Sequence, residues 1–436
     1  MRYRLEIPIL AALGTCTALT GALAGEITIA TVNNGDMIRM QGLTSEFTAA
    51  HPDVTVNWVT LEENTLRERV TTDIATGGGQ YDILTIGNYE VPIWGKQGWL
   101  VPLEFDADYD ADDLLPAIRG GLSVDDKLYA APFYGESAFL MYRTDLFEAA
   151  GLTMPEEPTW EFIGEAARKI TDASNGVAGI CLRGKAGWGE NMALIGSMAN
   201  SFGARWFDEE WAPQFDQPEW QAALQFYADL MKDAGASGAS SAGFNENLTM
   251  FQQGRCGMWV DATSAGSFVS NPNDSTVADK VAYTIFPNKE GVDNHGNWLW
   301  SWNLAIPASS KNQEDAKTFI TWATNKAYTE LVAEKEGWSN VPPGTRTSLY
   351  ENQNYLDAAA FAGPTKAAMD AADITKPTVQ PVPYTGGQFV AIPEFQSIGT
   401  TVGQLFSAVV AGQSSVEDAL AQAQSSTERE MRRAGY

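Results

Sequence analysis

The chain has 436 residues, of which 44% are hydrophobic, so its length allows two or three domains with sizeable cores. Its formal net charge of −27 opposes binding to nucleic acids and anionic lipid surfaces, because both recognise basic patches. We therefore expect no nucleic-acid partner.

The first 24 residues have the organisation of a cleavable signal peptide. Arg2 and Arg4 precede an apolar, uncharged stretch, and Ala22-Leu23-Ala24 has small residues at the spacing of a cleavage site. No later segment has 18 uncharged apolar residues, so we expect a soluble, periplasmic protein cleaved near Ala24. A lipoprotein signal ending at Cys16 is the alternative, although the Thr before this Cys fits it poorly.

The segment after the signal alternates between strand and helix patterns. We expect strands at residues 26–32, 54–58 and 81–86, and a helix at residues 41–50. Thr65-Leu66-Arg67-Glu68 has the pattern of a capping box at the start of a second helix, which the glycines at 77–79 would end. This β-α-β-α-β order predicts a parallel sheet with right-handed crossovers.

The rest of the chain is richer in helix, but strands recur in it. We expect a loop at residues 235–243, a strand at residues 256–260, and helices at residues 159–170, 190–202, 218–233, 247–253, 315–324, 329–336 and 415–433. This pattern favours two α/β lobes over one barrel, which needs eight evenly spaced strand–helix units.

Three tryptophans occupy alternate positions in the segment Asn297-Trp298-Leu299-Trp300-Ser301-Trp302-Asn303. In a strand, alternate side chains point to the same face, so the three indoles would form one aromatic wall. Two interpretations are open. The indoles fill a core, or at least one of them covers the apolar face of a sugar-like ligand.

Two cysteines, Cys181 and Cys256, remain after the signal. In an oxidising compartment they could form a disulfide; alternatively, both are small buried hydrophobic residues.

The motifs of common catalytic and metal sites are absent from the sequence. Its two histidines, His51 and His295, belong to no HxxH or HExxH motif, and there is no CxxC pair and no G-x-S-x-G elbow. We expect no metal, no cofactor and no catalytic residues. Carboxylates from distant segments could still converge on a glycosidic bond, so a secreted glycan-degrading enzyme is the alternative.

Several segments resemble the extracellular solute-binding proteins of carbohydrate ABC transporters, of the maltose-binding type. These segments are Tyr81-Asp82-Ile83-Leu84-Thr85-Ile86-Gly87, Leu128-Tyr129-Ala130-Ala131-Pro132-Phe133-Tyr134-Gly135, Tyr142-Arg143-Thr144-Asp145-Leu146-Phe147 and Ala305-Ile306-Pro307. Others are similar to the sorbitol- and mannitol-binding branch: Gly187-Trp188-Gly189-Glu190-Asn191, Trp259-Val260-Asp261-Ala262-Thr263 and Val341-Pro342-Pro343-Gly344-Thr345-Arg346.

The resemblance implies an α/β fold of the type II periplasmic-binding-protein class, with ligand between two lobes that are discontinuous in sequence. It implies an N-terminal lobe of residues 25–137 with 303–340, and a C-terminal lobe of residues 138–302 with 341–436. The chain would cross between the lobes near residues 136–139, 299–303 and 338–346.

Ligands of open α/β sheets lie beyond the carboxyl ends of the strands, so polar residues after strands are candidates for the site. The expected ligand-binding residues are Asn33, Asn34, Asp36, Glu63, Asn88, Glu90, Glu136, Trp188, Asp261, Trp300, Trp302 and Arg346. Tyr384 and Gln388 are weaker candidates. Each has a structural alternative: the Asn and Asp residues suit turns and caps, and Arg346 could pair with Asp261 or Glu136.

The resemblance implies a receptor that binds a sugar alcohol, sorbitol or mannitol, and delivers it to a membrane permease. Carboxylates would accept hydrogen bonds from the hydroxyls, Arg and Asn would donate, and an indole would cover the carbon chain. Of the three tryptophans, we expect Trp300 or Trp302 to contact the ligand and Trp298 to pack in the core. The alternative ligand is another mono- or oligosaccharide, and we expect a monomer.

Overall fold

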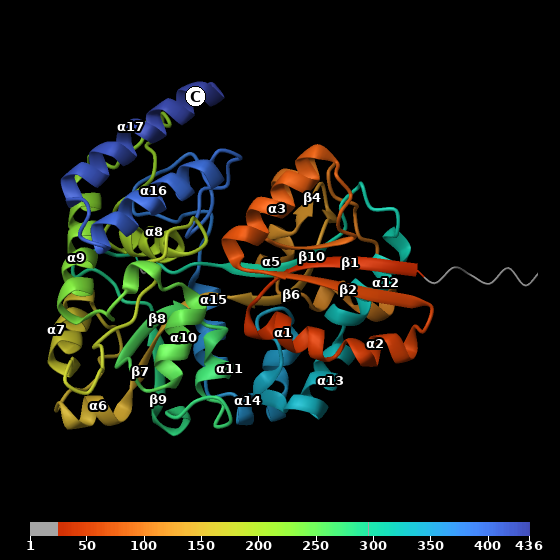
Figure 1. Cartoon of the computed structure of the whole chain (residues 1–436), viewed down its shortest axis with the longest axis horizontal. Helices are drawn as coiled ribbons and strands as arrows, with labels where there is room; N and C mark the ends of the chain where they lie inside the picture. Colours follow the sequence, from red (N-terminus) through yellow and green to blue (C-terminus); the bar gives the residue numbers. More distant parts are fainter. Residues whose placement is uncertain (1–24, 295) are drawn as a thin grey trace, which may run out of the picture.

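The computed structural model describes residues 25–294 and 296–436; the expected signal peptide, residues 1–24, and His295 lie outside the described residues. The chain forms two α/β lobes that lie side by side, each around its own sheet (Figure 1). Among the described residues, no helix is both long and apolar enough to cross a membrane.

The first lobe contains a five-stranded sheet with the order β2-β1-β3-β10-β6. β1 (Gly25–Val32) pairs in parallel with β2 (Val54–Leu61) and with β3 (Ile83–Gly87), which confirms the predicted parallel arrangement. β10 (Trp300–Ala305) is antiparallel to β3 and to β6 (Ala131–Glu136). Every residue of β3 is buried, as expected for a central strand with helices on both faces.

Helices of the first lobe begin and end at physically recognisable residues, though not always where the sequence predicted. The single helix expected at 41–50 is two helices, α1 (Gly35–Gly42) and α2 (Thr44–Ala50). α3 (Glu63–Thr76) begins earlier than the expected capping box, because the Glu62 side chain accepts a hydrogen bond from the Thr65 N–H. Gly77 ends α3 at φ 62°, as predicted. The other helices of this lobe are α4 (Glu90–Lys96), α5 (Pro116–Gly121), α12 (Gln313–Thr324) and α13 (Lys326–Glu336), and a hairpin of β4 (Ser123–Val124) and β5 (Lys127–Leu128) completes it.

The second lobe is built on an antiparallel sheet with the order β8-β7-β9, formed by β7 (Ala138–Arg143), β8 (Met258–Ala262) and β9 (Val281–Ile285). Its helices are α6 (Thr144–Ala149), α7 (Trp160–Ile170), α8 (Asn191–Ser201), α9 (Pro218–Ala234), α10 (Phe244–Gln252), α11 (Ala265–Val269), α14 (Gln353–Ala358), α15 (Ala362–Ala371), α16 (Phe395–Val410) and α17 (Val416–Ala434). The predicted helices of this region are present. α10 begins three residues earlier than predicted, and α6, α11, α14, α15 and α16 were not predicted.

The first two passages of the chain between the sheets lie close to the predicted segments, whereas the third lies after the predicted residues 338–346. Only Ser137 separates β6 of the first sheet from β7 of the second. Trp300 already pairs with Glu136 in the first sheet, so the second passage lies before Trp300 and not at Asn303. Residues 343 and 344 run beside Gly135 before the chain reaches α15, which packs on β7 and β9. Residues 345–348 still bond to Asp113 and Leu115 of the first lobe, so we propose lobes of residues 25–137 with 300–348, and 138–299 with 349–436.

Cys181 and Cys256 form a disulfide, with Cα atoms 5.9 Å apart, and both are fully buried. The bond joins the residues just before the 183–190 loop to the residues just before β8. It therefore ties the base of that loop to the second sheet.

Candidate functional site

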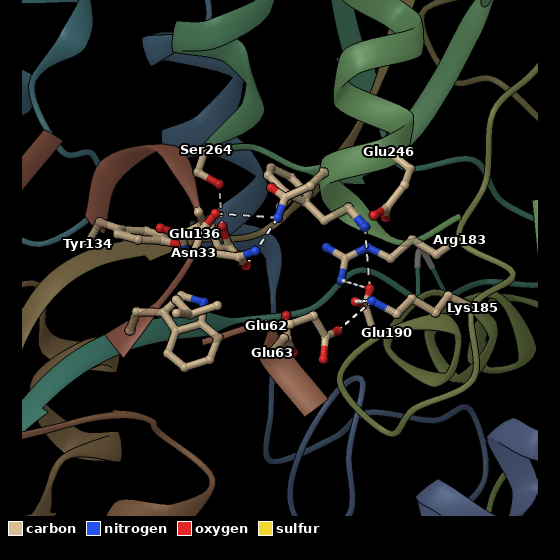
Figure 2. Close-up of a pocket in the computed structure, with 16 residues that line it drawn as sticks. Asn33, Glu62, Glu63, Tyr134, Glu136, Arg183, Lys185, Glu190, Glu246 and Ser264 are labelled. Atoms are coloured by element: carbon tan, nitrogen blue, oxygen red, sulfur yellow. Dashed lines mark hydrogen bonds and ion pairs between the residues drawn. The ribbon is translucent and has the colours of Figure 1, made fainter. Parts of the chain in front are cut away.

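Two adjoining cavities lie between the lobes. The first, which we call the polar cavity, has a volume of about 510 Å³ and is lined by Asn33, Asn34, Glu62, Glu63, Tyr134, Glu136, Arg183, Lys185, Glu190, Phe244, Asn245, Glu246, Ser264 and Trp302, among others (Figure 2). The second, the aromatic cavity, has a volume of about 360 Å³ and shares Glu63, Glu136, Arg183 and Trp302 with the first.

The polar lining residues follow the carboxyl ends of strands from both lobes. Asn33 follows β1, Glu62 and Glu63 follow β2, Glu136 ends β6, and Ser264 follows β8. These strands end at the interlobe face, which is where ligands of α/β sheets bind. The strand ends named by the sequence argument thus border the cavity, and the binding role of their residues stays a prediction.

On the second-lobe side, Arg183 presents its guanidinium to both cavities. Its Nη2 and Nε lie 2.6 and 2.9 Å from the carboxylate oxygens of Asp261, and its Nη1 donates to the carbonyl of Gly189. Asp261 is fully buried, also accepts from the Trp259 indole, and lines neither cavity. The expected ligand contact at Asp261 is therefore replaced by a supporting role, in which it orients Arg183.

On the first-lobe side, Arg67 forms a similar buried network. Its Nη2 lies 2.8 Å from Glu63 and its Nη1 lies 2.9 Å from Glu90. Glu90 lines neither cavity; it also accepts from the N–H of Gly87, and burial raises the pKa of its carboxyl. Glu63 lines both cavities and Arg67 lines the aromatic cavity, so these two members of the network can face a ligand.

Glu136 lies at the passage between the lobes and lines both cavities. It is 6% exposed, and its Oε2 accepts a hydrogen bond from the Ser264 hydroxyl. Burial raises the pKa of Glu136 to about 8, because a desolvated carboxylate is disfavoured relative to the neutral acid. At neutral pH this group is largely a carboxylic acid, which can both donate and accept hydrogen bonds.

Four indoles, those of Trp188, Trp298, Trp300 and Trp302, line the aromatic cavity, and Trp302 also reaches the polar cavity. They form no flat wall: Trp300 meets Trp302 edge-to-face at a centroid distance of 5.6 Å and an interplanar angle of 81°. The Arg67 guanidinium lies 3.9 Å from the ring centroid of Trp188. Each indole is therefore fixed by packing, which suits a rigid site.

Three further candidates lie away from both cavities. Arg346 donates to the carbonyls of Tyr109, Asp110 and Thr324 and pairs with Asp113, so the expected pairing with Asp261 or Glu136 is wrong. Asp36 pairs with Arg39 at 2.7 Å, and burial raises its pKa to about 6. Asn88 donates to the carbonyl of Leu299, behind the indoles. Of the weaker candidates, Gln388 lines the aromatic cavity, whereas Tyr384 accepts from the Trp206 N–H.

The remaining candidates line the cavities as expected, and Asn34 also caps α1 and donates to the Tyr134 hydroxyl. Sequence reasoning missed several lining residues, which are Glu62, Arg67, Tyr134, Arg183, Lys185, Glu190, Asn245 and Ser264. The sequence could have indicated Arg183, because this residue directly follows a short apolar run that begins at Gly179, and it precedes Gly184, as a polar residue at the end of a strand does. Lys185 and Glu190 lie in the same segment within 3.5 Å of each other, but no pattern in that segment indicated that they line a cavity.

Direct contacts cross the cleft between the two lobes. Lys185 Nζ lies 2.5 Å from Glu62 Oε1, and the Asn64 side chain donates to the carbonyl of Ala186 at 3.1 Å. A Cβ placed on Gly189 would lie 2.3 Å from an oxygen of Glu63, so a larger residue here would have to displace the Glu63 carboxylate. The lobes therefore stand in a closed arrangement around the cavities.

Comparisons with known proteins agree with this architecture. The family model for bacterial extracellular solute-binding proteins matches residues 34–330. The chain is 58% identical over 414 residues to the mannitol-binding protein of Pseudomonas aeruginosa, covering 95% of this chain and 94% of that protein. A crystal structure of an ABC transporter solute-binding protein from Agrobacterium vitis S4 with bound D-mannitol is 66% identical, with a TM-score of 0.94 over 95% of this chain and all of that chain. A solute-binding protein from Agrobacterium radiobacter K84 in complex with ribitol is 25% identical, with a TM-score of 0.82 over 93% of this chain and 98% of that chain.

Proposed function

Because the chain belongs to the family of bacterial extracellular solute-binding proteins, we propose that it captures a linear hexitol, mannitol or sorbitol, for an ABC importer. The observation that carries this proposal is the likeness to a structure with bound D-mannitol, at 66% identity over 95% of the chain. The cavities between the lobes have the chemistry that such a ligand needs.

A hexitol is neutral and carries a hydroxyl on every carbon, so a site for it needs many polar groups and few flat apolar ones. Glu63 and Glu136 accept hydrogen bonds from hydroxyls, and Arg183 donates. Trp302, which borders both cavities, covers the carbon chain. A ligand without one of these hydroxyls leaves a buried group unpaired, which is how the site discriminates.

Binding stabilises the closed arrangement of the lobes, because ligand contacts come from both of them. Glu63 belongs to the first lobe and Arg183 to the second, so both contact the ligand only when the cleft is closed. The closed form then docks on membrane permease subunits and releases the hexitol. We place the mature monomer in the periplasm, after cleavage near Ala24, with a binding role and no catalysis.

A thermal-shift panel of purified mature protein tests this function. Mannitol or sorbitol at about 100 times Kd should add about 2.7 kcal/mol to the free energy of unfolding. Maltose-like disaccharides should add none. A shift with disaccharides and none with hexitols would contradict the proposed ligand. Release of reducing ends from a glycan panel would contradict the absence of catalysis.

A further inference from the structure

Acidic groups outnumber basic ones around the two cavities. The carboxylates that line them or contact a lining residue are Glu62, Glu63, Glu90, Glu136, Glu190, Glu246 and Asp261, whereas the cations are Arg67, Arg183 and Lys185. A neutral hexitol does nothing to offset this excess of negative charge. The charge of the site therefore bears on which polyols it accepts.

Each of the three cations is already paired with carboxylates. Arg67 contacts Glu63 and Glu90, and Arg183 contacts Asp261 and lies 3.6 Å from Glu190. Lys185 contacts Glu62 and lies 3.5 Å from Glu190. Among the described residues, none of these three cavity cations is left to pair with a further buried carboxylate in the cleft.

The other buried or partly buried carboxyl groups that line the cavities each pair with a cation. Glu136 is also buried, but no cation in the described part of the chain lies within ion-pair distance of it. Its only side-chain partner there is the Ser264 hydroxyl on Oε2, so Oε1 is left for the cavity (Figure 2). Glu136 borders both cavities, so a bound polyol can reach it from either one.

The groups around Glu136 explain why its charge is unsatisfied. Burial opposes ionisation most strongly, Ser264 and Arg183 favour it, and the charges of Asp261 and Glu63 oppose it again. The neighbouring Tyr134 stays neutral, because burial raises its pKa. A cation supplied by the ligand would provide the missing partner, and an anion would add to the repulsion.

We propose that the cleft accepts amino-hexitols, linear polyols that carry a protonated amine on a terminal carbon, and rejects hexonates, which carry a carboxylate there. The ammonium group replaces a terminal hydroxyl and donates hydrogen bonds to Glu136, so a charged pair forms in a desolvated site. This inference rests on the proposed function, because the rest of the ligand is the hexitol chain.

Isothermal titration with three probes at pH 7 and pH 8 tests the inference: D-mannitol, 1-amino-1-deoxy-D-mannitol and D-mannonate. Glu136 must lose its proton before it pairs with the amine. With a pKa of about 8, the fraction already ionised rises about fivefold between these two pH values. Affinity for the amine, relative to mannitol, should therefore rise about fivefold, and mannonate should bind at least tenfold more weakly than mannitol.

Glu136→Gln should remove the pH-dependent gain in the ratio of amine to mannitol affinity, because the amide stays neutral. Asp73→Asn is the matched control. Asp73 is also a buried carboxyl group that forms no ion pair among the described residues, but it lies on α3 away from both cavities, so the gain should persist. If Glu136→Gln does not fold, the pH dependence in the wild-type protein still decides.

An amine that binds at least tenfold more weakly than mannitol at both pH values would overturn the inference, as would mannonate that binds as well as mannitol. Each of these results leaves the proposed function intact. Failure of mannitol to bind, with the amine still bound, would overturn the proposed hexitol function and leave the preference for a cation at Glu136 standing. If none of the probes binds, both are wrong.

Discussion

The ion pair between Lys185 and Glu62 joins the two lobes across the cleft, so it should contribute to ligand retention. The perturbation is Lys185→Met, which keeps the length of the side chain and removes its charge. Lys185 Nζ lies 2.5 Å from Glu62 Oε1, and the two side chains are 26% and 37% exposed. Glu190 keeps Arg183 as a partner in this variant.

The magnitude follows from this exposure. Exposed ion pairs contribute about 0.2–1 kcal/mol, and solvent screens a pair that is more than a quarter exposed on each side. We therefore expect a loss of about 1 kcal/mol at most, which raises Kd by up to about fivefold. Because the pair forms only when the lobes are closed, the dissociation rate should increase and the association rate should change little.

Stopped-flow measurement of tryptophan fluorescence with mannitol gives both rates, since several indoles line the cavity. Lys289→Met is a matched control, because Lys289 pairs with Glu161 inside the second lobe with both side chains 35% exposed. Glu62→Gln should match Lys185→Met, and the double variant should be no worse than either. Gln retains an oxygen that caps α3 at Thr65.

Three results would refute this reasoning. One is a dissociation rate that is unchanged in Lys185→Met. Another is an equal increase in Lys289→Met, which would indicate a general effect of lost surface charge. The third is full additivity of the two cleft substitutions, which would show that Lys185 and Glu62 act independently.

Three other predictions concern the indoles, the hinge carboxyl group and the disulfide. Trp302→Leu should weaken mannitol binding at least tenfold in titration calorimetry. Trp298→Leu should mainly lower the free energy of unfolding, by about 2 kcal/mol. Equal losses of affinity in the two variants would indicate that the indoles form a single aromatic wall. Glu136 retains a proton in the folded state up to pH about 8 but loses it near its ordinary pKa when the chain is unfolded. In urea titrations, the free energy of unfolding of the ligand-free wild type should therefore fall relative to that of Glu136→Gln as the pH rises from 5 to 8, by at most about 1.4 kcal/mol per pH unit. A difference that stays constant with pH would refute the raised pKa. Replacing Cys181 and Cys256 with Ala should cost about 2–5 kcal/mol in urea unfolding and leave affinity within about threefold, and a large affinity loss would mean that the disulfide shapes the site.

Local sequence patterns predicted most of the fold. The period-two strands and the helix signals located β1 to β3 and most of the long helices, because these elements are specified by their own residues. α3 shows the limit of such patterns: Thr65 to Glu68 matches a capping box, yet Glu62 is the residue that caps the helix. Two side chains within one turn can each accept a hydrogen bond from the free N–H groups at a helix start, and tertiary packing selects which of them does so.

The candidate site was predicted where a residue faces the cavity directly, and missed where long-range pairing decides its role. Asn33, Glu63 and Glu136 follow or end strands, Trp302 lies within β10, and all four line the polar cavity. Asp261 also ends a strand, but it is covered by Arg183, which comes from a segment 78 residues away. Such pairings leave no local trace in a single sequence.

The central claim is that one linear hexitol binds in the cavities between the lobes. A crystal structure of the mature protein grown with D-mannitol tests it most directly. The account predicts one mannitol molecule between Glu63 and Arg183, with hydroxyls at Glu136 and the carbon chain against Trp302. Density for mannitol elsewhere, or cavities that hold only water while mannitol saturates the protein in solution, would contradict it.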